Sequence, residues 1–318
     1  MSPNEVIIAY FDKITINLYF SILFDKIVSG DDYMRKKPTI AFMYDFDKTL
    51  CDQDMQNYTF IPNLNMSSDE FWSETEKFSK KNYMEGILAY MYYMMYKCKE
   101  KGVPFTKEYL RSMDKNVNFY KGVINWFDRI NKYGESLGVN VEHYIISSGI
   151  KDIIDGSEIK DEFKKIFACQ YYFDENGEVL WPKIAINYTQ KTQYIFRISK
   201  GAYDETDTRK VNDKMSDRLI PYNNMIYIGD GITDVPCMTF VKKQGGISIA
   251  IYPKGSKDKV TKLLLDNRVN YICSADYQEG SDLDSLVKLI MQNINIDHKL
   301  LLKQKQQRTR ESKRVKKD

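Results

Sequence analysis

Residues 40–50 read IAFMYDFDKTL, and this stretch decides how the rest of the chain is interpreted. Four apolar residues and a tyrosine predict a buried strand that runs directly into Asp45. Asp45 and Asp47 lie two residues apart, so their side chains leave an extended chain on the same side. Because a buried strand gains no stability from two carboxylates at its end, we expect them to belong to a functional site.

The composition is that of a soluble globular protein. The chain has 318 residues, of which 43% are hydrophobic and 29% charged, which allows a large core with an inserted or second domain. The five cysteines are scattered and include no CxxC pair, which argues against a disulfide framework or a zinc site and favours the reducing cytoplasm. They are Cys51, Cys98, Cys169, Cys237 and Cys273.

Positive charge is concentrated at the C-terminus. Residues 299–318 contain nine Lys or Arg and two acids, a net charge of +7, so residues 1–298 carry −4 of the total of +3. We expect this basic tail to be a disordered end or a frayed helix. Contact with nucleic acid or an anionic surface is its functional interpretation. Charge runs are common at termini, however, and we favour a solvated tail without a nucleic-acid partner.

Residues 1–37 form an N-terminal extension, with apolar helical runs that charged residues interrupt. The uncharged span at residues 14–24 has 11 residues, fewer than the roughly 20 that a transmembrane helix needs. We therefore expect no membrane partner, and we find no convincing signal peptide. Two interpretations stay open, an additional helix or a true start at Met34.

The remaining chain separates into a helical block and an alternating pattern. Residues 53–118 predict helices only, including the apolar and aromatic YMEGILAYMYYMMYKCKEKG, which ends at Gly102. Beyond them helices and strands alternate, which predicts a parallel sheet covered on both faces. The predicted elements are helices at 122–138, 150–167 and 191–201, a hairpin at 169–187, and strands at 139–149, 224–231, 247–253 and 269–277.

Three of the predicted strands end in polar residues of complementary kinds. These are Asp45 and Asp47, Ser147 and Ser148, and Asp230 with Asp234. Open parallel sheets bind ligands beyond the carboxyl ends of their strands, so these side chains are expected to meet. Clustered carboxylates suit a hard cation such as Mg²⁺. Beside such a cation, one carboxylate is expected to attack phosphorus while its neighbour transfers the proton. Each motif alone has an ordinary explanation as a turn or a cap, but their joint occurrence in this order favours the site.

The segments YDFDKTL, IISSG, a downstream lysine and YIGDGITDVPCM resemble the four motifs of the haloacid dehalogenase-like (HAD) hydrolase superfamily, in its phosphoserine-phosphatase-like branch. The resemblance implies an α/β fold: a three-layer core of Rossmann type with a parallel sheet, and an inserted helical cap of the C1 type. The core would comprise residues 38–52 and 119–298, and the cap residues 53–118. The extension 1–37 and the tail 299–318 would lie outside it.

The same resemblance implies the roles of the acidic residues. Asp45 would be the nucleophile that forms an aspartyl-phosphate. Asp47 would be the general acid toward the leaving group and then the base toward water. Mg²⁺ would be held by Asp45, by the backbone carbonyl of Asp47 and by Asp230, with Asp234 in support.

The resemblance also implies a phosphate-binding set at residues 147–149. Ser147 matches the hydroxyl of the family, Ser148 lies one position later, and Gly149 completes the set. Lys191 opens a predicted helix as KT, which is how the family presents its lysine. Lys200, in SKG, is closer to the fourth motif and is the alternative.

Together these features predict a Mg²⁺-dependent phosphatase that hydrolyses a small phosphomonoester through an aspartyl-phosphate. A phosphotransferase or mutase of the same superfamily is the nearest enzymatic alternative. A non-catalytic binding protein that uses the core as a scaffold is the alternative from another class. The sequence does not identify the substrate, and a homodimer formed through the apolar helical cap is an open alternative to a monomer.

Overall fold

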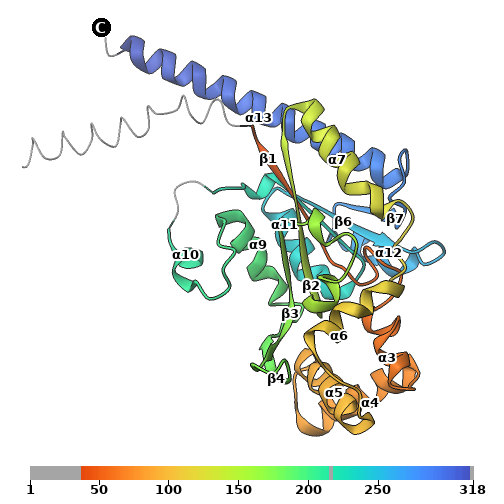
Figure 1. Cartoon of the computed structure of the whole chain (residues 1–318). Helices are drawn as coiled ribbons and strands as arrows, with labels where there is room; N and C mark the ends of the chain where they lie inside the picture. Colours follow the sequence, from red (N-terminus) through yellow and green to blue (C-terminus); the bar gives the residue numbers. More distant parts are fainter. Residues whose placement is uncertain (1–36, 215–217, 316–318) are drawn as a thin grey trace, which may run out of the picture. The chain divides into compact units, whose positions relative to one another are not determined.

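The computed structural model describes residues 37–214 and 218–315, shown in colour in Figure 1. Almost the whole N-terminal extension, with the alternative start at Met34, lies outside the described residues. Residues 39–295 form one compact unit, which contains the complete sheet.

The described residues form a seven-stranded sheet in the order β4-β3-β2-β1-β5-β6-β7. All neighbouring strands are parallel except β3 and β4, which form the predicted hairpin. The prediction of an α/β fold with a parallel sheet is therefore confirmed. The strands are β1 (Thr39–Tyr44), β2 (Asn140–Ile150), β3 (Lys165–Phe173), β4 (Val179–Ile184), β5 (Met225–Gly229), β6 (Ile247–Tyr252) and β7 (Tyr271–Ser274).

The central position of β1 follows from its side chains. Its residues from Ile40 to Tyr44 are all fully buried, as a strand covered on both faces requires. Tyr44 pairs with Ile145 of β2 on one side and with Ile228 of β5 on the other. Because the three strands run in parallel, their carboxyl ends emerge at the same edge of the sheet, where the polar motifs begin.

Helices cover the two faces of this sheet (Figure 1). α9 and α11 pack against each other and against the sheet, whereas α7 packs on β2 and contacts the first half of α13. Right-handed crossovers place the two groups on opposite faces. The α-helices of the described residues from Val123 onward are α7 (Val123–Leu137), α8 (Lys151–Ile154), α9 (Lys191–Lys200), α10 (Thr208–Asn212), α11 (Val235–Lys243), α12 (Asp258–Leu265) and α13 (Asp282–Val315).

The segment between β1 and α7 contains helices and no named strand among its described residues. Ser67 caps the first long helix by accepting a hydrogen bond from the Glu70 amide, and Gly102 ends the second in the left-handed conformation that the sequence pattern indicated. The helices are η1 (Met55–Asn57), α3 (Phe60–Asn63), α4 (Ser68–Asn82), α5 (Gly86–Lys101), α6 (Lys107–Arg111) and η2 (Ser112–Asn116).

The helix predicted at residues 150–167 is wrong for most of its length. Only α8 and the short 3₁₀ helix Lys160–Glu162 form there, and β3 begins at Lys165. The residues from Ile166 to Cys169 are buried, because β3 pairs with β2 inside the sheet. An apolar run of this length fits a helix or a buried strand equally well, and the tertiary context selects the strand.

The last helix extends into the predicted tail. α13 is continuous from Asp282 to Val315, so residues 299–315 are helical rather than a disordered end. Its side chains are exposed from Lys303 onward through the described residues. Within the described parts of the chain, none of the helices combines the length and the hydropathy that crossing a membrane requires.

Candidate active site

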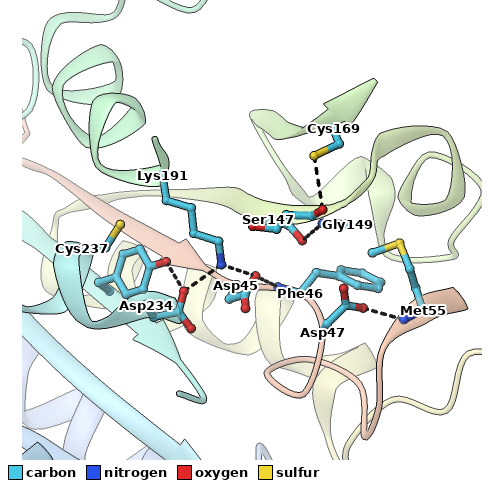
Figure 2. A network of polar contacts seen from close by, with 12 residues as sticks. Asp45, Phe46, Asp47, Met55, Ser147, Gly149, Cys169, Lys191, Asp234 and Cys237 are labelled. Carbon is cyan, nitrogen blue, oxygen red and sulfur yellow. Dashed lines mark hydrogen bonds and ion pairs between the residues drawn. The ribbon is translucent and has the colours of Figure 1, made fainter. Parts of the chain in front are cut away.

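The loop after β1 orients the first two carboxylates by hydrogen bonds to its own backbone. Oδ1 of Asp45 accepts a hydrogen bond from the Phe46 amide at 2.8 Å, and Oδ1 of Asp47 accepts one from the Met55 amide at 2.7 Å. Lys48 turns the chain with a φ of 57°, in the left-handed region that few non-glycine residues adopt. The strand therefore ends in a tight loop that presents both carboxylates at the sheet edge (Figure 2).

Lys191 connects the loop after β1 to the loop after β5. As the first residue of α9, it extends its side chain toward the sheet edge, where it is 1% exposed (Figure 2). Its Nζ lies 2.9 Å from Oδ1 of Asp45 and 2.8 Å from Oδ1 of Asp234. Burial alone would lower the pKa of Lys191, but the two carboxylates raise it above the usual value, so the ammonium stays charged.

Three carboxylates meet beside this ammonium. Asp45, Asp230 and Asp234 each offer one oxygen, and these oxygens lie within 4.8 Å of one another. Burial and the charge of Asp234 raise the pKa of Asp45 to about 7, although Lys191 opposes the shift. Burial and the charges of Asp234 and Asp45 raise the pKa of Asp230 to about 8. The cluster thus holds more negative charge than Lys191 neutralises.

This cluster fits a hard divalent cation. Among the described residues, Oδ2 of Asp234 is buried without a hydrogen-bond partner, which is costly for a carboxylate oxygen that holds no ligand. Oxygen donors alone, gathered from two strand ends, are the set that Mg²⁺ prefers. Of the four residues predicted to hold metal, the structure gathers the carboxylates of Asp45, Asp230 and Asp234. Asp47, predicted to contribute its backbone carbonyl, follows Asp45 in the same loop and is not part of this carboxylate cluster.

Asp47 stands in an environment suited to a proton donor. Burial raises its pKa well above the usual range, and the charges of Asp54 and Asp45 raise it further. A carboxyl group that keeps its proton near neutral pH can donate it to a leaving group. The surroundings of Asp47 therefore favour its protonated form, which is the form that a proton donor requires.

The loop at the end of β2 lies against the loop after β1. The Ser147 hydroxyl is buried and accepts a hydrogen bond from the Gly149 amide at 2.9 Å. A Cβ added at Gly149 would lie 2.1 Å from the Met55 methyl group and 3.0 Å from Oδ2 of Asp47, so glycine allows this approach. At Ser148 it is the backbone carbonyl that is held, by the Tyr90 hydroxyl at 2.5 Å.

The structure separates the two candidate lysines. Lys191 contacts the carboxylates, whereas Nζ of Lys200 donates to the carbonyls of Val211 and Asp213 at 2.6 and 2.8 Å. Lys200 is the last residue of α9 and Lys191 the first, so the two lie about 14 Å apart along the helix axis at the usual rise. Of the two, Lys191 alone is placed for a role at the site.

Sequence reasoning missed the residues that support the site. The Tyr227 hydroxyl donates to Oδ1 of Asp234 at 2.8 Å, and Tyr90 of α5 reaches the Ser148 carbonyl. A signal existed for Tyr227: it precedes Gly229 by two residues in the strand YIG, so both face the same side of the sheet. No comparable signal marks Tyr90 among the aromatic residues of its helix.

Gly229 permits the close approach of Asp234, and we expect its replacement to be destabilising. In Gly229→Ala the new Cβ would lie 2.5 Å from Oδ2 and 2.7 Å from Cγ of Asp234, which is fully buried. We expect the free energy of unfolding to fall by about 1–3 kcal/mol, measured by urea denaturation. Gly231→Ala is the matched control, because nothing lies within 4 Å of a Cβ there. Equal stability of the two variants would contradict this packing.

Comparison with known protein families agrees with this geometry. The model of the family Put_Phosphatase, described as Putative Phosphatase, matches residues 40–268, which is more than half of the chain. An uncharacterized protein of Borreliella burgdorferi is 29% identical over 271 residues, covering 77% of this chain and 93% of that protein. The match with the family model includes every residue of the carboxylate cluster.

Solved structures share the fold. A HAD-family hydrolase from Salmonella enterica serovar Typhi superposes with a TM-score of 0.51 at 15% identity, covering 80% of this chain and 72% of that one. A substrate-bound phosphoserine phosphatase superposes with a TM-score of 0.50 at 14% identity, covering 80% of this chain and 99% of that one. Both similarities concern the architecture of the sheet and its helices.

The chain has the HAD-like fold that these structures share, with a buried carboxylate cluster at the edge of its sheet. The chain belongs to the Putative Phosphatase family. Family membership supports a hydrolase of the phosphatase type.

Proposed function

We propose that the protein is a Mg²⁺-dependent phosphatase that hydrolyses a small phosphomonoester through an aspartyl-phosphate on Asp45. The observation that carries this proposal is the buried Lys191 ammonium, shared between Asp45 and Asp234 at 2.9 and 2.8 Å. A carboxylate held in this way is fixed in orientation and keeps one oxygen free to attack. Release of phosphate from a generic aryl phosphate, with and without Mg²⁺, tests the proposal.

In the first half of the reaction, Asp45 acts as the nucleophile. One of its carboxylate oxygens forms a bond to phosphorus, and the bond from phosphorus to the leaving oxygen breaks. Asp47 donates its proton to that oxygen, so the leaving group departs as an alcohol. The raised pKa of Asp47 supports this role, because burial and the neighbouring carboxylates keep the group protonated beforehand.

In the second half, water regenerates Asp45. The Asp47 carboxylate, now ionised, takes a proton from a water molecule whose oxygen attacks phosphorus. The bond between phosphorus and the Asp45 oxygen breaks, inorganic phosphate leaves, and Asp47 has recovered its proton. Ser147, the Gly149 amide and Lys191 would hold the phosphoryl oxygens, and Lys191 would offset their charge.

Mg²⁺ would be held by Asp45, the backbone carbonyl of Asp47 and Asp230, with Asp234 in support. When bound, the cation neutralises charge on the phosphoryl group and makes phosphorus more open to attack. The unpartnered Oδ2 of Asp234 and the raised pKa values of Asp45 and Asp230 support a cation at this position.

The surroundings of the site support several further assignments. We infer that residues 53–118 form a cap that selects the leaving group, because Tyr90 of α5 contacts the Ser148 carbonyl beside the site. The core would then comprise residues 38–52 and 119–298. Five buried, unpaired cysteines support a location in the cytoplasm. We propose that the exposed end of α13 is solvated and has no nucleic-acid partner. A homodimer formed through the cap is one oligomeric state to test.

The pKa values predict how stabilisation by Mg²⁺ depends on pH. The pKa values of Asp45 and Asp230, about 7 and about 8, exceed those in an unfolded chain. These groups therefore stabilise the cation-free fold below about pH 4, and this contribution is lost as the pH rises through about 7 to 8. Mg²⁺ binds the ionised carboxylates, so it should raise the Tm more at about pH 8.5 than at about pH 6. Equal shifts in Tm at the two pH values would contradict this cation site.

A further inference from the structure

Tyr227 contributes a hydroxyl to the carboxylate cluster that no step of the proposed reaction uses. It lies on β5, is fully buried, and donates to Oδ1 of Asp234 at 2.8 Å. Burial and the charge of Asp234 raise its pKa well above the usual range, so the hydroxyl keeps its proton and acts as a donor. A buried tyrosine in a strand fills the core with its ring alone, and the hydroxyl needs a separate explanation.

The two oxygens of Asp234 have different surroundings. Oδ1 accepts from both Lys191 and Tyr227, whereas Oδ2 is buried with no hydrogen-bond partner among the described residues. A Cβ added at Gly229 would lie 2.5 Å from Oδ2, so the backbone there borders the carboxylate closely and limits its rotation from that side. Two donors on one oxygen and a close contact on the other fix the orientation of Asp234. Oδ2 is thereby left available as a ligand.

The hydroxyl also affects how Lys191 is shared. The ammonium has three N–H donors, and two of them reach Asp45 and Asp234. If the Tyr227 hydroxyl were removed, Oδ1 of Asp234 would keep only the hydrogen bond from Lys191. The ammonium would then be drawn toward Asp234 and away from Asp45. The tyrosine hydroxyl lets a single lysine serve both carboxylates.

We propose that Tyr227 is a positioning residue, whose hydroxyl orients Asp234 so that Oδ2 can support the cation while Lys191 remains on Asp45. This inference rests on the proposed function, because it assigns the cluster a cation. Tyr227 acts through Asp234 and Lys191 and does not contact the reacting atoms. Partners that orient a metal-binding carboxylate in this way strengthen metal affinity about tenfold to a hundredfold.

The test compares Tyr227→Phe with a closely matched control. Tyr144→Phe removes a hydroxyl at the same level of the sheet, because Met43 of β1 pairs with Tyr227 on one side and with Tyr144 on the other. Tyr144 is also fully buried, but its hydroxyl contacts Glu142 and Tyr203 and not the carboxylate cluster. A role confined to packing or stability would affect both variants alike.

The readout is the affinity for Mn²⁺ alone, measured by calorimetry on the full chain, since Mn²⁺ accepts the same oxygen ligands. We expect Tyr227→Phe to bind Mn²⁺ about tenfold to a hundredfold more weakly than wild type, and Tyr144→Phe to bind as wild type does. Excess Mg²⁺ should restore most of the turnover of Tyr227→Phe. The rise in Tm on adding Mn²⁺, relative to the cation-free Tm of each variant, gives the same comparison if Tyr227→Phe is less stable.

Two outcomes separate this inference from the proposed function. If wild type binds Mn²⁺ and Tyr227→Phe binds it equally well, the inference is overturned and the proposed cation site stands. If wild type binds no Mn²⁺, the cation site and the inference are both overturned. Weaker binding by Tyr144→Phe to the same extent as Tyr227→Phe would also overturn the inference, because the effect would then be a general one of lost hydroxyls.

Discussion

Asp45→Asn is expected to abolish the Mg²⁺-dependent release of phosphate from an aryl phosphate. The amide has nearly the shape of the carboxylate but lacks its nucleophilic oxygen, so turnover should fall by at least about a thousandfold. The variant should not be less stable than wild type in the absence of Mg²⁺. Burial and the charge of Asp234 raise the pKa of Asp45 to about 7, so the ionised carboxylate is unfavourable there, and an amide removes that charge.

Asp128→Asn provides the matched control for this substitution. Asp128 is an exposed residue of α7 that pairs with Lys132, and the same chemical change there should leave turnover unchanged. Each preparation should be checked by mass spectrometry, because deamidation of asparagine would regenerate the wild-type residue. Full turnover by verified Asp45→Asn would refute Asp45 as the nucleophile. Loss of turnover together with loss of the folded state would point to a structural role instead.

Lys191→Met is expected to reduce both stability and turnover. The ammonium is 1% exposed and lies against two carboxylates that are also buried, so an isosteric apolar side chain leaves them without compensation. Breaking a buried ion pair by removing one partner costs about 3–5 kcal/mol, and partial protonation of Asp45 favours the lower value. Turnover should fall about a hundredfold to a thousandfold, because a preorganised charge at the phosphoryl group is lost.

Lys200→Met distinguishes this role from that of a general surface lysine. It removes two hydrogen bonds to the carbonyls of Val211 and Asp213, at a cost of about 1 kcal/mol in the free energy of unfolding. Turnover measured well below the Tm of each variant should be normal in Lys200→Met and low in Lys191→Met. The reverse pattern would contradict the assignment of Lys191.

The sequence was sufficient to predict the parts of the site that lie at strand ends. Asp45, Ser147 and Asp230 directly follow or end apolar runs, and a parallel sheet brings such positions to one edge. The sheet order and the contact between Lys191 and Asp45 required coordinates. Two lysines, at the first and last positions of α9, were candidates, with Lys191 preferred and Lys200 as the alternative. Spacing along the chain does not show which end of a helix faces the site.

Other features depend on tertiary contacts that the sequence does not display. Alternation along the strand places Tyr227 on the same side of the sheet as Gly229, but the sequence does not show that the Tyr227 hydroxyl reaches Asp234. The chain at residues 150–167 was predicted as a helix, but pairing with β2 makes its end a strand. Local propensity is a weak guide where an edge of the sheet offers backbone partners.

The most direct test of the account is to locate the phosphoryl group during turnover. Asp47→Asn should accumulate the intermediate from an aryl phosphate, because an aryloxide leaves without protonation whereas attack by water needs the base. Acid quenching and borohydride reduction convert an aspartyl-phosphate to homoserine, which mass spectrometry of peptides can locate. We expect homoserine at position 45, dependent on substrate and Mg²⁺. Phosphate release by wild type with no modification at position 45 in Asp47→Asn would contradict a covalent intermediate on Asp45.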